Sequence, residues 1–164
     1  MAGKYMNVVD DVFLYDLTMR LVAAVFLGGL LGLNRDLHRK PAGIRTLALV
    51  SLGGAMATIL VLGPGVQNGT PDIAAVSRVL QGILTGIGFI GVGVIIRDAA
   101  GHVSGLTTAA TIWVSAIMGT LCGFGYWQLI TVSTLLIMAI LIFGGRLEKF
   151  AERMFKRQQP PPEQ

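Results

Sequence analysis

Charged residues are scarce in this sequence. Asp, Glu, Lys and Arg make up 13% of its 164 residues, against roughly 25% in an average soluble domain, whereas 53% of the residues are hydrophobic. A chain of this size keeps about a third of its surface exposed after folding. So large an apolar excess disfavours a water-soluble fold and indicates that the protein is surrounded by lipid.

Residues that support catalysis or metal binding are also few. The single cysteine, Cys122, excludes an intramolecular disulfide and a cysteine-only metal site. The two histidines, His38 and His102, fall in expected loops, and the sequence has neither an H-E-x-x-H nor a G-x-S-x-G motif. We therefore expect no enzyme, no metal site and no cofactor.

The net charge of +4 fits either nucleic acid or a membrane surface as the partner. The basic residues flank apolar segments and have few aromatic residues among them, which is untypical of nucleic-acid binding. The lipid bilayer is therefore the expected partner, and nucleic acid is not.

Five apolar segments predict an all-α membrane protein with five transmembrane helices. They cover residues 17–33, 46–62, 73–96, 106–122 and 127–144. Each has roughly 17–24 residues, enough at about 1.5 Å per residue to cross a hydrocarbon core of about 30 Å. The first also resembles a signal peptide, but basic residues follow it where a cleavage site should be.

We expect the chain to consist of four segments. Residues 1–16 form an outer interfacial segment, and residues 17–145 form the transmembrane domain. Residues 146–157 carry an apolar stripe on a basic helix that suits the cytoplasmic membrane surface, and residues 158–164 are expected to be disordered.

Positive charge predicts the orientation, because Lys and Arg are retained on the cytoplasmic side. Ten of the 13 follow segments one, three and five: Arg35, Arg39, Lys40, Arg45, Arg97, Arg146, Lys149, Arg153, Lys156 and Arg157. We therefore expect the N-terminus to lie outside and the C-terminus in the cytoplasm.

An internal repeat relates the first two segments to the next two. A shift of 62 residues places Gly43-Ile44-Arg45-Thr46 on Gly105-Leu106-Thr107-Thr108 and Arg35-Asp36 on Arg97-Asp98, and a shift of 58 places Arg20 on Arg78 and Gly28 on Gly86. Chance matching of small residues is the alternative. A true repeat predicts two parallel two-helix units plus one helix, as in some transporters.

Glycines within the apolar segments have two interpretations. Residues 86–91 satisfy G-x-G-x-x-G, but a dinucleotide site needs a preceding strand and a later acidic residue, which this apolar run lacks. Small residues at four-residue spacing instead let transmembrane helices approach closely, within the chain or between two copies. The predicted helix-packing residues are Gly28, Gly32, Gly82, Gly86, Gly88, Gly91, Gly93, Ser115 and Gly119.

Two arginines lie within apolar segments, Arg20 and Arg78. They either extend toward the outer headgroups or pair with acids: Asp16, on the same helical face as Arg20, and Asp72 or another acidic side chain brought in by folding.

At the inner end, the two G-[IL]-x-T sequences each begin a helix. Their threonines either cap the helix or help to form an anion or headgroup site, because two helix N-termini would converge near basic side chains. The candidate binding or regulatory residues are Arg35, Asp36, Arg45, Thr46, Asp72, Arg78, Arg97, Asp98, Thr107 and Thr108.

Four stretches resemble the MgtC/SapB family of bacterial inner-membrane proteins: GGLLGLNRD, KPAGIRTLALVSLGG, SRVLQGILTGIGFIGVGVIIRD and GHVSGLTTAATIWVSAIMG. The resemblance covers residues 17–145 and implies a five-span protein that supports growth under magnesium limitation and survival in macrophages. It also implies restraint of the F-type ATP synthase. The matched motif positions are Arg35, Asp36, Pro41, Gly43, Arg45, Thr46, Arg78, Gly86, Gly88, Gly91, Gly93, Gly105, Leu106, Thr107, Thr108 and Trp113.

Two departures limit what the resemblance implies. The family's first loop usually reads Glu-Arg-Glu, where this chain has Asn34-Arg35-Asp36. Many members also continue into a cytoplasmic ACT-like domain, so activities that need that domain are not expected of residues 1–164.

Three functions remain open from the sequence: a regulator, an ion transporter and a purely structural scaffold. Every acidic residue lies at or beyond a segment end, whereas a Mg²⁺ pathway should carry carboxylates at membrane depth. This favours a regulator that binds another membrane complex, with a homodimer also possible. The alternative is an ion transporter or channel for Mg²⁺, phosphate or protons, which the parallel repeat and the paired Arg-Asp loops favour.

Overall fold

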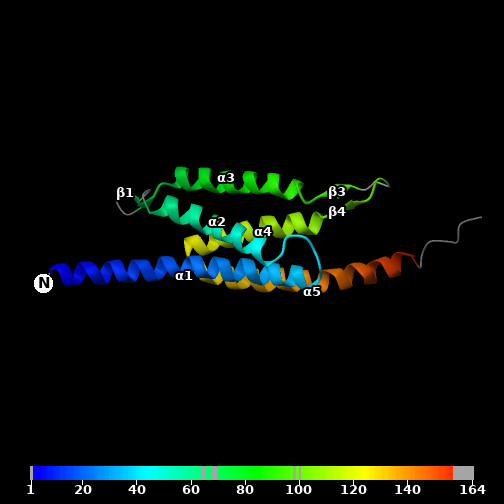
Figure 1. The fold of residues 1–164 in the computed structure, drawn as a ribbon, viewed down its shortest axis with the longest axis horizontal. Helices are drawn as coiled ribbons and strands as arrows, with labels where there is room; N and C mark the ends of the chain where they lie inside the picture. Colours follow the sequence, from blue (N-terminus) through cyan, green and yellow to red (C-terminus); the bar gives the residue numbers. More distant parts are fainter. Residues whose placement is uncertain (1, 64–65, 68–69, 98, 100, 157–164) are drawn as a thin grey trace, which may run out of the picture. The chain divides into compact units, whose positions relative to one another are not determined.

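The computed structural model describes residues 2–63, 66–67, 70–97, 99 and 101–156 (Figure 1). Five helices account for most of them: α1 (Ala2–Leu37), α2 (Ile44–Leu62), α3 (Ile73–Val92), α4 (Leu106–Phe124) and α5 (Trp127–Lys156). Each contains a stretch long and apolar enough to cross a membrane. The expected all-α class with five spanning helices is confirmed.

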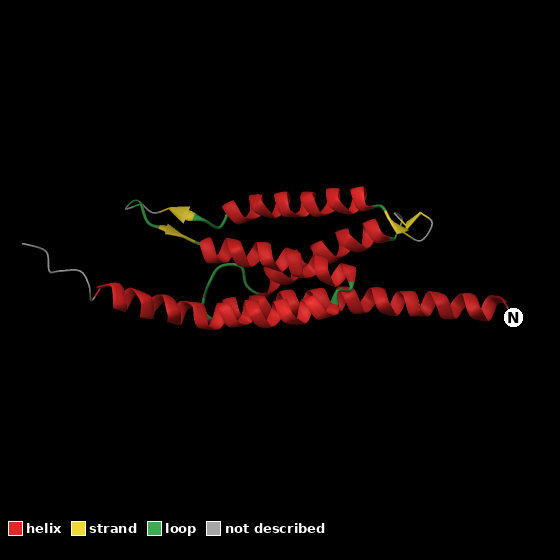
Figure 2. Ribbon diagram, turned by 180° about the vertical axis from the view of Figure 1, so that it is seen from behind, coloured by secondary structure: helices red, strands yellow, loops and turns green. Residues whose placement is uncertain are grey.

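Two short hairpins flank α3 (Figure 2). Strands β1 (Val66–Gln67) and β2 (Thr70–Pro71) join α2 to α3, and strands β3 (Ile96–Arg97) and β4 (Val103–Ser104) join α3 to α4. The third apolar segment was expected to continue to residue 96, but α3 ends at Val92. Ile96 instead pairs with Ser104, because the chain after Gly93 leaves the helix for the hairpin.

The chain divides into two compact units, residues 1–130 and residues 131–164. The first unit holds α1 to α4 and the beginning of α5, and the second holds the rest of α5. Helix α1 runs without a break past residue 16, and α5 runs without a break past residue 145. The functional division of the chain at those two positions stays a prediction.

The core of the first unit is formed by α1, α2 and α4, which meet through small residues. A Cβ atom on Gly28 of α1 would lie 2.5 Å from the carbonyl oxygen of Leu47, and one on Gly54 of α2 would lie 2.6 Å from that of Ala116. Gly119 of α4 lies directly against the backbone of Ser51. These helix axes approach so closely only because side chains are absent at the contacts.

Helix α4 lies at the centre and α3 at the edge of this unit. Ten residues of α4 are buried, whereas Gly91 is the only buried residue among the described residues of α3. Gly91 contacts Ala109, at 3.5 Å from the position that its Cβ would take. The side chain of Ser115 also donates a hydrogen bond of 2.8 Å to the carbonyl oxygen of Leu47, which joins α4 to α2.

Candidate functional site

Arg35 is a buried cation in the last turn of α1. Only 5% of the residue is exposed, and Nη2 donates a hydrogen bond to Oγ1 of Thr108, a buried residue in the first turn of α4. The Nε atom has no hydrogen-bond partner among the residues that the structure describes. Among the described residues, no carboxylate oxygen lies within 4.0 Å of this guanidinium group. The charge is therefore buried without a countercharge in the described part of the chain.

Asp36, the next residue, caps α2. Its Oδ2 accepts a hydrogen bond of 3.0 Å from the backbone N–H of Ile44, which satisfies one of the free amide groups at the start of that helix. A Cβ atom on Gly43 would overlap this carboxylate. Arg39 and Ala42, with φ of 50° and 59°, turn the loop back toward α1. The neighbouring Arg35 and Asp36 side chains thus serve two different helices.

The other candidates at this end of the unit are exposed. Arg45 and Thr46 lie in the first turn of α2, Thr107 lies in the first turn of α4, and Arg97 lies in β3. Gly43 and Gly105, the residues directly before α2 and α4, have no side chain that could cap these helices. Asp98 lies outside the described residues. The α1–α2 loop and the β3–β4 hairpin are at the same end of the unit, so these polar residues lie at one end of it (Figure 1).

Arg20 binds the other end of α4. Its Nη1 donates a hydrogen bond of 2.7 Å to the carbonyl oxygen of Gly123, and its Nε lies 2.8 Å from Oδ2 of Asp16. The carbonyl end of a helix attracts a cation, and a carboxylate one helical turn away neutralises it. Of the two interpretations of Arg20, the structure therefore favours pairing with Asp16.

The corresponding residues of α3 are arranged differently. The Asp72 carboxylate accepts a hydrogen bond of 2.9 Å from the N–H of Ala74 and caps α3. Arg78 is exposed and forms no ion pair with Asp72 among the described contacts. The predicted repeat therefore does not give its two arginines the same surroundings.

The predicted helix-packing residues fall into two groups. Gly28, Gly32 and Gly119 lie against the backbone of a neighbouring helix or of the loop before it, Gly91 lies against Ala109, and Ser115 bonds to α2. In contrast, a Cβ atom on Gly82, Gly86 or Gly88 would meet nothing within 4 Å, and Gly93 is an exposed residue at the end of α3.

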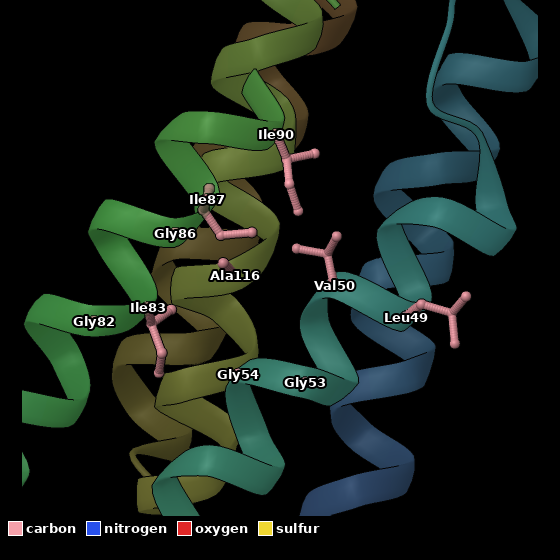
Figure 3. Close-up of a pocket in the computed structure, with 10 residues that line it drawn as sticks. All are labelled: Leu49, Val50, Gly53, Gly54, Gly82, Ile83, Gly86, Ile87, Ile90 and Ala116. Carbon is pink, nitrogen blue, oxygen red and sulfur yellow. The ribbon is translucent and has the colours of Figure 1, made fainter. Parts of the chain in front are cut away.

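Between α2 and α3 lies an open apolar groove of about 400 Å³ (Figure 3). Ile83, Ile87 and Ile90 of α3 project into the space that faces Val50 of α2. Gly82 and Gly86 leave the α3 backbone bare along the groove, and Ala116 of α4 also lines it. No charged side chain is among the lining residues.

Metal binding finds no support in the described residues, in which no three His, Cys, Asp or Glu side chains come close enough to hold an ion. The sequence did not predict the contact of Arg35 with Thr108 or the cap by Asp36. Gly28, Gly32 and Arg35 recur at i, i+4 and i+7, which places them on one helical face. That spacing could have predicted that Arg35 continues the packing surface of α1.

Known proteins resemble this chain over most of its length. The model of the MgtC family matches residues 21–150. Protein SrpB of Synechococcus elongatus is 38% identical over 142 residues, which cover 82% of this chain and 78% of that protein. Protein MgtC of Salmonella typhimurium is 36% identical over 145 residues, which cover 88% of this chain and 58% of that protein.

Protein MgtC of Brucella abortus is 40% identical over 120 residues, which cover 73% of this chain and 48% of that protein. This chain thus spans only about half of the length of these MgtC proteins. No solved structure matches it. The extent of the match and the five apolar helices establish that the chain is a membrane protein and belongs to the MgtC family.

Proposed function

We propose that this protein is a non-enzymatic regulator that binds another inner-membrane complex and thereby supports growth when magnesium is limiting. The F-type ATP synthase is the partner that the family resemblance implies. The proposal is for the five-helix part of the family, because residues 1–164 span only 58% of the Salmonella MgtC protein.

The observation that carries this proposal is the groove between α2 and α3. Transmembrane helices associate through small residues that allow close backbone contact, because lipid provides no hydrophobic drive for association. Gly82 and Gly86 offer such a surface, since a Cβ atom on either would meet no described residue within 4 Å. The adjacent isoleucines would pack against the side chains of an incoming helix.

The charge distribution also supports a binding role over cation conduction. Asp36 caps α2 and Asp72 caps α3, whereas Asp16, within α1, forms an ion pair with Arg20. A Mg²⁺ pathway needs oxygen ligands along its length. The groove instead offers hydrocarbon side chains and bare backbone.

The experiment compares three glycine variants of one helix. Gly82→Leu and Gly86→Leu fill the groove, whereas Gly88→Leu adds the same side chain to α3 at a position that does not line it. All three gain helix propensity. We expect the first two to lose rescue of low-magnesium growth in a strain that lacks its own copy, and Gly88→Leu to retain it.

Direct binding is measured with a photocrosslinking residue. Placed at Ile87 in the groove, it should capture a subunit of the ATP synthase in native membranes, and Gly86→Leu should reduce the yield. At Val92, an exposed α3 residue outside the lining, it should capture little. Equal growth and crosslinking for all variants would refute the docking surface. Liposomes with purified protein that move Mg²⁺, phosphate or protons above empty-vesicle background would establish the transporter function instead.

A further inference from the structure

The environment of Arg35 is electrostatically incomplete. The N-terminal end of a helix carries partial positive charge, because its first amide groups have no partner within the helix. Arg35 places a full positive charge against this end of α4, through its bond to Thr108 in the first turn. The Arg35 charge and the positive end of α4 therefore lie together. Because Arg35 is 95% buried, water does not screen the repulsion between them.

The acid next to Arg35 in the sequence is used elsewhere. Asp36 is adjacent in sequence, but its carboxylate accepts the N–H of Ile44 and stabilises the start of α2. The Nε atom of Arg35 is a buried donor with no acceptor in the described part of the chain. A buried donor of this kind is normally satisfied, and a charged one costs more when it is not. Among the described residues, the site therefore lacks both an acceptor for Nε and a negative charge.

We propose that the Arg35 guanidinium and the first turn of α4 bind the phosphate group of an anionic ligand. Phosphate matches the planar donor fork of arginine and the free amide groups at a helix N-terminus. Arg45 and Thr107 are exposed at the same end and provide donors and positive charge around the approach. The phosphate group belongs either to a membrane phospholipid or to free inorganic phosphate, because both present the same oxygens.

This site is separate from the groove between α2 and α3, which carries the proposed function. None of the lining residues of the groove is Arg35, Thr107 or Thr108. A failure of partner binding at the groove therefore does not count against the phosphate-binding proposal. A failure of phosphate binding does not count against the docking proposal.

The test uses the purified full chain, delipidated in a non-ionic detergent. Three probes are compared by thermal unfolding and by native mass spectrometry: inorganic phosphate, short-chain phosphatidic acid, and the matching diacylglycerol, which lacks the phosphate group. We expect one equivalent of a phosphate-bearing probe to bind and to raise the melting temperature, and diacylglycerol to do neither. Binding of phosphatidic acid alone identifies the lipid headgroup as the source, and binding of inorganic phosphate identifies the free ion.

Two variants separate the site from general surface charge. Arg35→Met should weaken binding by about tenfold to a hundredfold, since a hydrogen bond to a charged group is worth about 1.5–3 kcal/mol and each 1.4 kcal/mol is about tenfold. Arg97→Gln removes an exposed charge at the same end and should change the affinity little.

If Arg35→Met does not fold, Thr108→Val replaces it, because valine keeps the shape of threonine and removes the hydroxyl that holds the guanidinium. This variant should also bind phosphate more weakly than wild type. Absence of binding by both phosphate-bearing probes, or an equal loss in Arg97→Gln and the Arg35 or Thr108 variant, would overturn the proposal.

Discussion

Two alanine substitutions at glycines should change stability in opposite directions. Gly119 of α4 lies against the carbonyl group and Cα of Ser51, whereas Gly86 of α3 has open space where a Cβ would be. The covalent change is the same in both variants. The comparison therefore isolates the effect of packing from the effect of helix propensity.

The magnitudes follow from the contacts. Replacement of a mid-helix glycine by alanine stabilises a helix by about 0.5–1 kcal/mol. At Gly119 the added methyl group meets backbone atoms, which cannot rotate away, and overpacking of this kind costs about 1–3 kcal/mol. We take the upper value of about 3 kcal/mol, because a shift of α4 would also disturb the Ser115 bond to Leu47 and the contact of Gly123 with Thr58.

The expected free energy of unfolding is thus about 2 kcal/mol lower for Gly119→Ala and about 0.5–1 kcal/mol higher for Gly86→Ala. For a chain of this length, these values correspond to a melting temperature about 4–8 °C lower and about 1–4 °C higher. Circular dichroism of the purified variants in detergent measures both. A Gly119→Ala variant that melts at or above the temperature of Gly86→Ala would refute the close packing of α2 and α4.

Three further outcomes are expected. Asp36→Ala should lower the unfolding free energy by about 1 kcal/mol through loss of the α2 cap, and Asp36→Asn should recover much of it in the same melting assay, because asparagine also accepts the N–H bond. Arg20→Met should destabilise the protein by about 1 kcal/mol through loss of the contacts with Gly123 and Asp16, whereas Arg78→Met, at an exposed residue, should change the melting temperature little. In a cysteine-free background, a cysteine at Gln67 should react with an impermeant thiol reagent in intact cells and one at His38 should not, and the reverse pattern would contradict the predicted orientation.

The five helices could be predicted because their signal is local. Each apolar run is long enough to span the bilayer, and an isolated backbone in lipid must satisfy its hydrogen bonds within a helix. The residue at which α3 ends was harder to predict. Ile95 and Ile96 are as apolar as the helix before them, but the helix ends at Val92 and Ile96 pairs with Ser104 of β4.

The candidate site could be predicted only in part, because the contacts within it join distant parts of the chain. The sequence indicates which residues are polar at the inner helix ends, but the partner of each depends on how distant helices meet. Arg35 and Thr108 are 73 residues apart, and Asp36 reaches Ile44 across a loop with two unusual backbone conformations. No spacing rule within one helix contains this information.

The glycines illustrate the same limit. Gly28 and Gly86 are matched by the predicted repeat and look alike in sequence, yet one is enclosed by α2 and the other is bare. Small-residue spacing predicts that a surface can be approached closely, but it does not predict what approaches it.

The position of α3 separates stable folding from partner recognition, two demands that usually compete within a small protein. Its outward residues contribute almost nothing to the interior, and hairpins at both ends attach it to the rest. Substitutions along that surface can therefore accumulate during evolution without loss of folding. Within one scaffold, homologues are free to change what they recognise by altering a single helix, while the three-helix core stays constant.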